Sequence, residues 1–215
     1  MAKVDILILS NGPGEVTTWV RPVVRALRQN LGDDRTLVRI SVVLSPCPNA
    51  TGFEAAIAQS FPEVDRVQSA SAFWQFLLWG KTIENWEWSD RGVVLFLGGD
   101  QFFPIVIGKR LGYRTVVYAE WDARWHSLID HFAVMKPNVA AHVQQKYAHK
   151  FTVVGDLMVE AQGEREIVAN SPTPNTVRLR NLSVEADRRA GEVERQGQER
   201  DDRQLLFSSP ASPAP

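Results

Sequence analysis

The chain has 215 residues and a formal net charge of -1, so its charge balance gives no reason to expect nucleic acid as a partner. Cys47 is the only cysteine, which excludes an internal disulfide or a thiolate metal cage and fits a cytoplasmic protein. No signal peptide is expected, because Asp5 interrupts the apolar start, and no apolar stretch approaches the roughly 20 residues of a membrane-spanning helix.

Short apolar strands alternate with helical segments along the first three quarters of the chain. Strands are expected at residues 4–9, 37–44, 65–68, 93–97, 115–118, 132–135 and 152–154. Helices are expected at 20–31, 52–60, 70–79 and 139–147, with a further one that has Pro104 in its first turn and ends at Gly112. Pro22 is expected to lie near the first turn of the helix that ends at Gly32.

Strands without polar alternation, separated by helices, indicate a parallel sheet covered on both faces. The predicted fold class is therefore α/β, with a doubly wound, Rossmann-like sheet. Ligands of such sheets bind at the carboxyl ends of the strands. The loops expected there are 10–18, 45–52, 98–104, 119–127 and 155–160.

The composition changes after about Gln162, where Trp, Tyr and Cys vanish and Arg, Glu, Gln, Asp, Ser and Pro dominate. Such a segment cannot bury enough apolar surface to offset its ordering entropy. The sequence therefore predicts one domain at 1–161 and a disordered polar tail at 162–215.

The loop after the first strand contains Asn11, Gly12, Gly14 and Glu15. It is a poor dinucleotide site, because Thr17 stands where a third glycine would be needed, and no Gly-Lys-Ser/Thr follows to make a P-loop. A tight turn of this kind lets the backbone approach a hydroxyl-rich or anionic ligand, and Glu15 is a candidate catalytic acid. The alternatives are a turn without a ligand and a carboxylate that only complements the helix dipole.

Asp100 follows a buried strand and two glycines, so its carboxylate is expected at the carboxyl end of that strand. There it could act as a general base towards a bound hydroxyl. The alternative is an N-cap of the next helix.

Residues 118–126 mix aromatic rings with charges, a combination that suits sugar binding, with a ring face for stacking and Arg124 for a phosphate. The histidines have no metal-ligand spacing, and neither a metal nor a cofactor is expected.

The segments ILILSNGPGE, LFLGGDQF, VVYAEWDARWHSLIDHFAVMKP and FTVVGDLMVEA occur in this order. Together they resemble the N-terminal half of lipid-A-disaccharide synthase and its cyanobacterial-type relatives, which have the two-domain GT-B glycosyltransferase architecture. The resemblance implies a metal-independent, inverting transfer of diacylglucosamine from its UDP conjugate to diacylglucosamine 1-phosphate. It also implies that Asp100 is the general base, that Gly14 and Glu15 belong to the first site loop, and that Trp121, Arg124 and Trp125 contact the acceptor.

The aromatic segment at 70–79 is apolar on more than one helical face. The family acts on acylated sugars at the bilayer surface, so the resemblance implies that Phe73, Trp74, Leu77 and Trp79 contact acyl chains or the inner face of the membrane. Core packing is the equal alternative.

The resemblance stops near residue 161, before the family's UDP-sugar-binding domain. We therefore expect the chain to hold only the acceptor half and to be inactive by itself. Two other readings stay open, a UDP-N-acetylglucosamine 2-epimerase-like enzyme and a non-enzymatic sugar- or lipid-binding domain.

Overall fold

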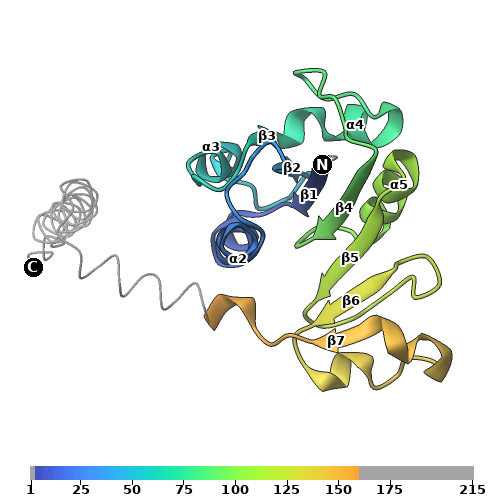
Figure 1. Ribbon diagram of the computed structural model, residues 1–215. Coiled ribbons are helices and arrows are strands. Elements are labelled where there is room, and N and C mark those ends of the chain that lie inside the picture. Colours follow the sequence, from blue (N-terminus) through green and yellow to red (C-terminus); the bar gives the residue numbers. More distant parts are fainter. Residues whose placement is uncertain (1–2, 160–215) are drawn as a thin grey trace, which may run out of the picture. The chain divides into compact units, whose positions relative to one another are not determined.

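The computed structural model describes residues 3–159 of the chain (Figure 1). The predicted polar tail at 162–215 and the domain boundary at 161 lie outside the described residues.

Seven parallel strands form one sheet in the order β3-β2-β1-β4-β5-β6-β7. They are β1 (Val4–Ser10), β2 (Val38–Leu44), β3 (Arg66–Gln68), β4 (Arg91–Phe96), β5 (Arg114–Ala119), β6 (His131–Val134) and β7 (Phe151–Val153). The strand order changes direction between β1 and β4, as in doubly wound dinucleotide-binding sheets. The predicted α/β, Rossmann-like fold class is therefore confirmed.

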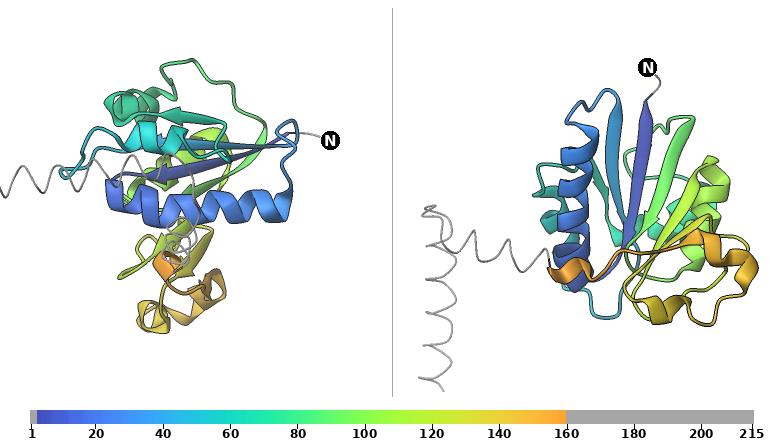
Figure 2. Two further views of the ribbon diagram at one scale, coloured as in Figure 1. Left: turned by 90° about the vertical axis from the view of Figure 1, so that its left-hand side faces the viewer. Right: turned by 60° about the horizontal axis from the view of Figure 1, so that its bottom comes forward.

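Helices cover both faces of the sheet, with α2 and α3 on one face and α4 and α5 on the other (Figures 1 and 2). The α-helices are α1 (Pro13–Glu15), α2 (Arg21–Leu31), α3 (Glu54–Gln59), α4 (Phe73–Trp79) and α5 (Phe102–Leu111). The remaining helical segments are the π-helical η1 (Val16–Val20) and the 3-10 segments η2 (Ala70–Ala72), η3 (Pro137–Ala140) and η4 (Gln145–Lys150).

The two core layers follow from the alternation of side chains along the strands. In β1, Ile6 and Ile8 face the layer that contains Val16, Val20 and Val24 of the first helical segment. Leu7 and Leu9 face the opposite layer, which contains Phe73, Phe76 and Leu77 of α4 and Ile107 of α5. Both sides of the strand are buried, which explains its continuous run of apolar residues.

The first helix starts earlier than predicted. It begins at Pro13 and passes through the π-helical η1 before it continues as α2, so Pro22 lies well inside the helical segment. Proline has no N–H to donate and crowds the preceding turn, and the wider π-helical turn just before it relieves this conflict. The hydroxyl of Thr18 donates to the carbonyl oxygen of Gly14 at 2.8 Å in the same segment.

The α-helix predicted at 139–147 is wrong. The two short 3-10 segments η3 and η4 occupy this region, and residues 141–144 separate them. Val139 packs against the core, but neither segment has a buried residue, so there is no apolar face to stabilise a longer helix.

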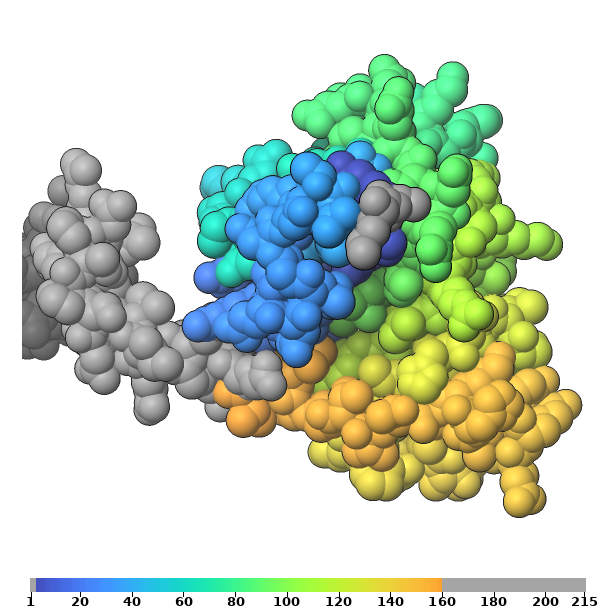
Figure 3. Space-filling model, viewed as in Figure 1, coloured from blue at the N-terminus to red at the C-terminus, as the bar shows by residue number. Residues whose placement is uncertain are grey.

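The segment after β7 returns across the carboxyl edge of the sheet. Leu157 packs against the core layer that contains the first helix, and Figure 3 shows the orange end of the described chain against the blue surface of that helix. The hydroxyl of Tyr118 donates to the carbonyl oxygen of Gly155 at 3.2 Å. This contact ties the end of β5 to the segment after β7.

A buried ionic network holds the amino edge of the sheet. The carboxylate of Asp5 is fully buried and accepts bonds from Nε and Nη2 of Arg39 at 2.6 and 2.8 Å. It also accepts the backbone N–H of Ser89 at 2.7 Å and the hydroxyl of Tyr113 at 2.9 Å. Burial by itself raises the pKa of Asp5, but the hydrogen bonds from these three residues outweigh burial, so the pKa is lowered.

Arg66 extends this network between two rings. Its guanidinium carbon lies 4.3 Å from the ring centre of Trp86 and 4.5 Å from that of Trp88. Burial, with a contribution from the nearby charge of Arg39, lowers the pKa of Arg66 to about 10. These ring contacts explain the position of two of the seven tryptophans, while Nη2 of Arg66 and Nε1 of Trp88 are buried without a hydrogen-bond partner among residues 3–159.

Candidate functional site

The loops after β1 and β4 meet at the carboxyl edge of the sheet, where the strand order changes direction. Ligands of open α/β sheets bind at this point. Residues 11–15 come from the first loop and residues 97–101 from the second. Two of the loops that the sequence indicated, 10–18 and 98–104, thus lie beside each other at the expected position.

Two glycines let Asn11 and Glu15 pack tightly into this edge. A Cβ atom at Gly98 would lie 2.6 Å from Oδ1 of Asn11 and 3.1 Å from Cγ of Glu15. A Cβ atom at Gly12 would lie 2.5 Å from Oε2 of Glu15. Any larger residue would displace these polar groups. The structure therefore brings together Asn11, Gly12 and Glu15, three of the residues selected from the sequence.

Two buried oxygens at this edge have no hydrogen-bond partner among residues 3–159, namely Oγ of Ser10 and Oδ1 of Asn11. Leaving such an atom unsatisfied costs roughly 1–3 kcal/mol, so it calls for an explanation such as a bound water, ion or ligand. The carboxamide oxygen of Asn11 is an acceptor and can take an O–H or N–H group of a ligand. Unpartnered acceptors beside a carboxylate suit a hydroxyl-bearing molecule.

The loop after β2 adds two residues that the sequence motifs missed. The backbone N–H of Ser45 donates to the carbonyl oxygen of Ser10 at 2.8 Å. The sulfur of Cys47 lies 3.4 Å from the position that a Cβ atom at Gly12 would occupy. Their place in the chain could have identified Ser45 and Cys47, since the loop at 45–52 follows β2, the strand that neighbours β1 in the sheet.

Gly14 and Asp100 lie in more open positions than the residues around Asn11. No atom outside the immediate chain lies within 4 Å of a Cβ built at Gly14. Asp100 is exposed, and its Oδ1 accepts the backbone N–H of Phe102 at 2.8 Å, at the start of α5. The N-cap of α5 is Gln101, so Asp100 lies one residue before the N-cap position that was its alternative, and its second oxygen remains available to a ligand.

Gln101 joins the loop after β4 to the loop after β5. Its side chain is buried, its Nε2 donates to the carbonyl oxygen of Asp122 at 2.9 Å, and its Oε1 accepts the backbone N–H of Arg124 at 2.9 Å. Sequence reasoning did not single out this residue. A glutamine at the N-cap of a helix carries no motif, and only the fold brings residues 122–124 to it.

The three acceptor-site candidates of the loop after β5 lie at the surface. Trp121 is 76% exposed, and Nζ of Lys136 lies 6.0 Å from its ring centre. Nε of Arg124 pairs with Oδ2 of Asp122 at 3.1 Å, with both side chains largely exposed. The ring of Trp125 lies 5.5 Å from that of Phe102. These rings are exposed and therefore accessible to a ligand.

The four aromatic and apolar candidates of α4 divide into two pairs. Phe73 and Leu77 are buried in the core, so core packing, the alternative for this helix, holds for them. Trp74 and Trp79 are 53% and 67% exposed. Leu78, also exposed, adds to this apolar surface. Only the second pair can meet a membrane or an acyl chain.

Within residues 3–159 no group of three or more His, Cys, Asp or Glu side chains lies close enough to hold a metal ion. No helix in the same part of the chain is long and apolar enough to cross a membrane.

Burial, together with the nearby charges of Asp156 and Glu120, raises the pKa of Tyr118, so its hydroxyl stays protonated as a hydrogen-bond donor at neutral pH.

Comparison with known proteins gives no further assignment for this arrangement: no protein-family model and no curated protein matches the chain.

Proposed function

We propose that the described domain is the acceptor-binding half of a glycosyltransferase of the lipid-A-disaccharide synthase type. In this proposal the edge between β1 and β4 binds diacylglucosamine 1-phosphate, and a UDP-linked diacylglucosamine donates its sugar. The proposal rests on the sequence resemblance and on the nature of the polar groups at this edge.

The observation that carries the proposal is the unpartnered, buried Oδ1 of Asn11 beside the carboxylate of Glu15. A sugar offers several hydroxyl donors in a small volume, and these can satisfy an amide oxygen and a carboxylate at the same time. A glycosyl acceptor must also lose one hydroxyl proton during the reaction. The edge holds two carboxylates suited to that task, those of Glu15 and Asp100.

The proposed reaction forms one bond and breaks one. The carboxylate of Asp100 or Glu15 accepts the proton of the acceptor hydroxyl, the hydroxyl oxygen attacks the anomeric carbon of the donor, and the bond from that carbon to the diphosphate breaks with inversion. UDP departs with the electron pair. Glu15 is the more enclosed of the two acids, whereas Asp100 has the freer approach from solvent.

The exposed apolar side chains of α4 support a peripheral contact with the cytoplasmic face of a membrane, where an acylated acceptor would be found. Trp74, Leu78 and Trp79 lie on the outer side of this short helix. Aromatic rings of this kind partition into the interface between headgroups and acyl chains. This contact would bring the domain to its acceptor without crossing the bilayer.

Equilibrium binding of diacylglucosamine 1-phosphate to the purified chain tests the proposal. Asn11→Ala removes the unpartnered acceptor and is expected to weaken binding roughly three- to tenfold, the value of one hydrogen bond. Asn30→Ala is the matched control, because that side chain is exposed on α2 and its Nδ2 donates to the carbonyl oxygen of Ala26 in the same helix. If both variants and the unchanged chain bound the acceptor with equal affinity, Oδ1 of Asn11 would not contact it, and this result would contradict the proposal.

A binding preference for UDP-N-acetylglucosamine over the acylated acceptor would instead favour the epimerase-like alternative. Such an enzyme has no use for an acyl chain, so its affinity would not depend on acylation.

A further inference from the structure

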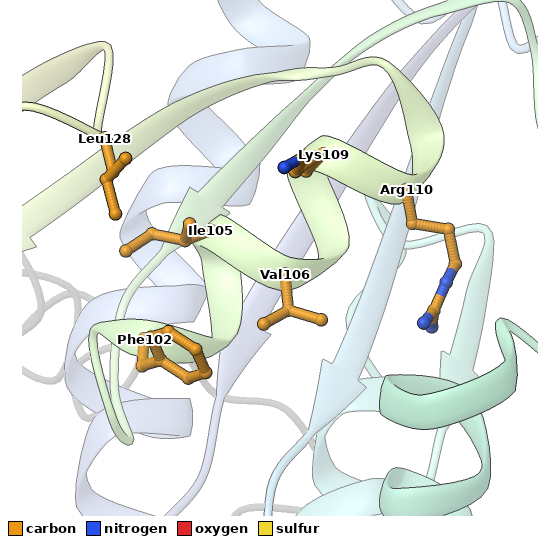
Figure 4. Close-up of a pocket in the computed structure, with 6 residues that line it drawn as sticks. All are labelled: Phe102, Ile105, Val106, Lys109, Arg110 and Leu128. Atoms are coloured by element: carbon orange, nitrogen blue, oxygen red, sulfur yellow. The ribbon is translucent and has the colours of Figure 1, made fainter.

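A groove of about 510 Å³ runs along α5, and none of its lining residues belongs to the loop that contains Asn11 (Figure 4). Phe102, Ile105, Val106, Lys109 and Arg110 of α5 line it, with Leu128 from the loop between β5 and β6. The volume falls in the range of small-molecule sites. From Phe102 to Lys109 the helix rises roughly 10 Å, so the groove suits an elongated ligand.

The lining of this groove is apolar and cationic, without an acidic residue. Figure 4 shows Ile105 and Val106 along the middle of the groove, with Phe102 at the start of the helix and Lys109 towards its end. Arg110 points to α4, where its Nη1 and Nη2 donate to the carbonyl oxygens of Phe76, Leu77 and Leu78 at the end of that helix. Lys109 is exposed, and within residues 3–159 its ammonium group has no ion-pair partner.

The backbone of Trp125 provides a second observation beside Phe102, which lines the groove at the start of α5. Its φ of 62° is in the left-handed region, which bulky residues rarely adopt. The amides of Leu128 and Ile129 donate to its carbonyl oxygen at 2.8 and 3.1 Å and hold this conformation. The result is a half-exposed ring that lies against Phe102. Strain that is maintained in order to place an exposed ring is typical of binding sites.

We propose that the groove on α5 binds a single-chain anionic amphiphile, such as an alkyl phosphate or a fatty carboxylate. The chain lies on Ile105, Val106 and Leu128 between the rings at Phe102 and the end of the helix. The anionic group meets Lys109. The lining favours such a ligand, because a neutral alkyl chain would not pair with the ammonium group of Lys109. An anion without an alkyl chain would leave the apolar side chains exposed to water. The inference does not depend on the proposed glycosyltransferase function.

Titration calorimetry of the full chain with octyl, decyl and dodecyl phosphate, each below its micelle concentration, tests this inference. A buried methylene raises affinity roughly fourfold, so affinity should increase with chain length until the groove is filled. Decanol should bind more weakly than decyl phosphate. An affinity that is independent of chain length, or binding to phospholipid vesicles without binding of the monomeric probes, would overturn the proposal.

Two pairs of variants locate the probe. Lys109→Gln should weaken decyl phosphate binding roughly tenfold and leave decanol unchanged, whereas Gln29→Glu on the opposite face changes the net charge equally and should leave both unchanged. A brominated decyl phosphate should lose most of its quenching of tryptophan fluorescence in Trp125→Phe and little in Trp19→Phe. Indistinguishable results within each pair would place the ligand elsewhere.

Discussion

Replacing Asp5 with asparagine keeps the size of a fully buried side chain but removes its negative charge. The carboxylate accepts two bonds from Arg39, one from the amide of Ser89 and one from the hydroxyl of Tyr113. Asparagine keeps one acceptor oxygen and turns an NH₂ group towards these donors. Breaking a buried ion pair on one side costs about 3–5 kcal/mol, because the remaining charge is left uncompensated. We therefore expect Asp5→Asn to lower the free energy of unfolding by about that amount.

Urea unfolding followed by circular dichroism and tryptophan fluorescence measures this change. The control is Asp33→Asn, since Asp33 is 75% exposed and its Oδ1 lies 3.6 Å from Nε of Arg28. An exposed pair contributes at most about 1 kcal/mol. The reasoning fails if Asp5→Asn costs no more than this control, because the network would then not hold the amino edge of the sheet.

Three more predictions follow from the same structure. The pKa of Asp5 in the folded protein lies below the unfolded value of 3.8, so its contribution to stability is complete above pH 3.8 and is lost as the pH falls through the folded pKa. The urea midpoint of the unchanged chain should therefore fall more steeply below pH 3.8 than that of Asp5→Asn. Gly98→Ala should cost about 1–3 kcal/mol and weaken acceptor binding, because the new Cβ would lie 2.6 Å from Oδ1 of Asn11; calorimetry gives the affinity. Phe73→Ala should cost about 3–5 kcal/mol in urea unfolding, whereas Trp74→Ala, at a half-exposed site, should cost less than about 1 kcal/mol.

Each of these predictions has an outcome that would contradict it. Parallel pH profiles of the two proteins would show that Asp5 does not have a lowered pKa. Normal acceptor binding by Gly98→Ala would mean that Asn11 can move without consequence. Equal costs for the Phe73 and Trp74 variants would contradict the inward and outward faces assigned to α4.

The sheet could be predicted from the sequence because strands buried on both faces leave an unambiguous signal. Leu7 and Leu9 face one helical layer and Ile6 and Ile8 the other, so β1 appears as an unbroken apolar run. Helical segments with few buried residues were harder to predict, because their sequences lack a clear apolar face. The segment at 139–147 forms short 3-10 turns, since almost nothing in it packs against the core.

The candidate site could be predicted only as a set of loops. Asn11, Gly12 and Glu15 were found because they follow a strong strand. Gln101 was missed because its role depends on a partner loop 21 residues further along the chain. Sequence periodicity also could not divide the four candidates of α4 into the two that face the core and the two that face solvent, since all four are apolar.

The central claim is that a sugar phosphate binds at the carboxyl edge between β1 and β4. Amide chemical-shift mapping with glucosamine 1-phosphate, which lacks the acyl chains that could occupy the groove on α5, tests it most directly. We expect shifts concentrated in residues 10–15, 45–47 and 98–102. Shifts confined to the amino edge around Asp5, or no saturable shifts at all, would contradict it.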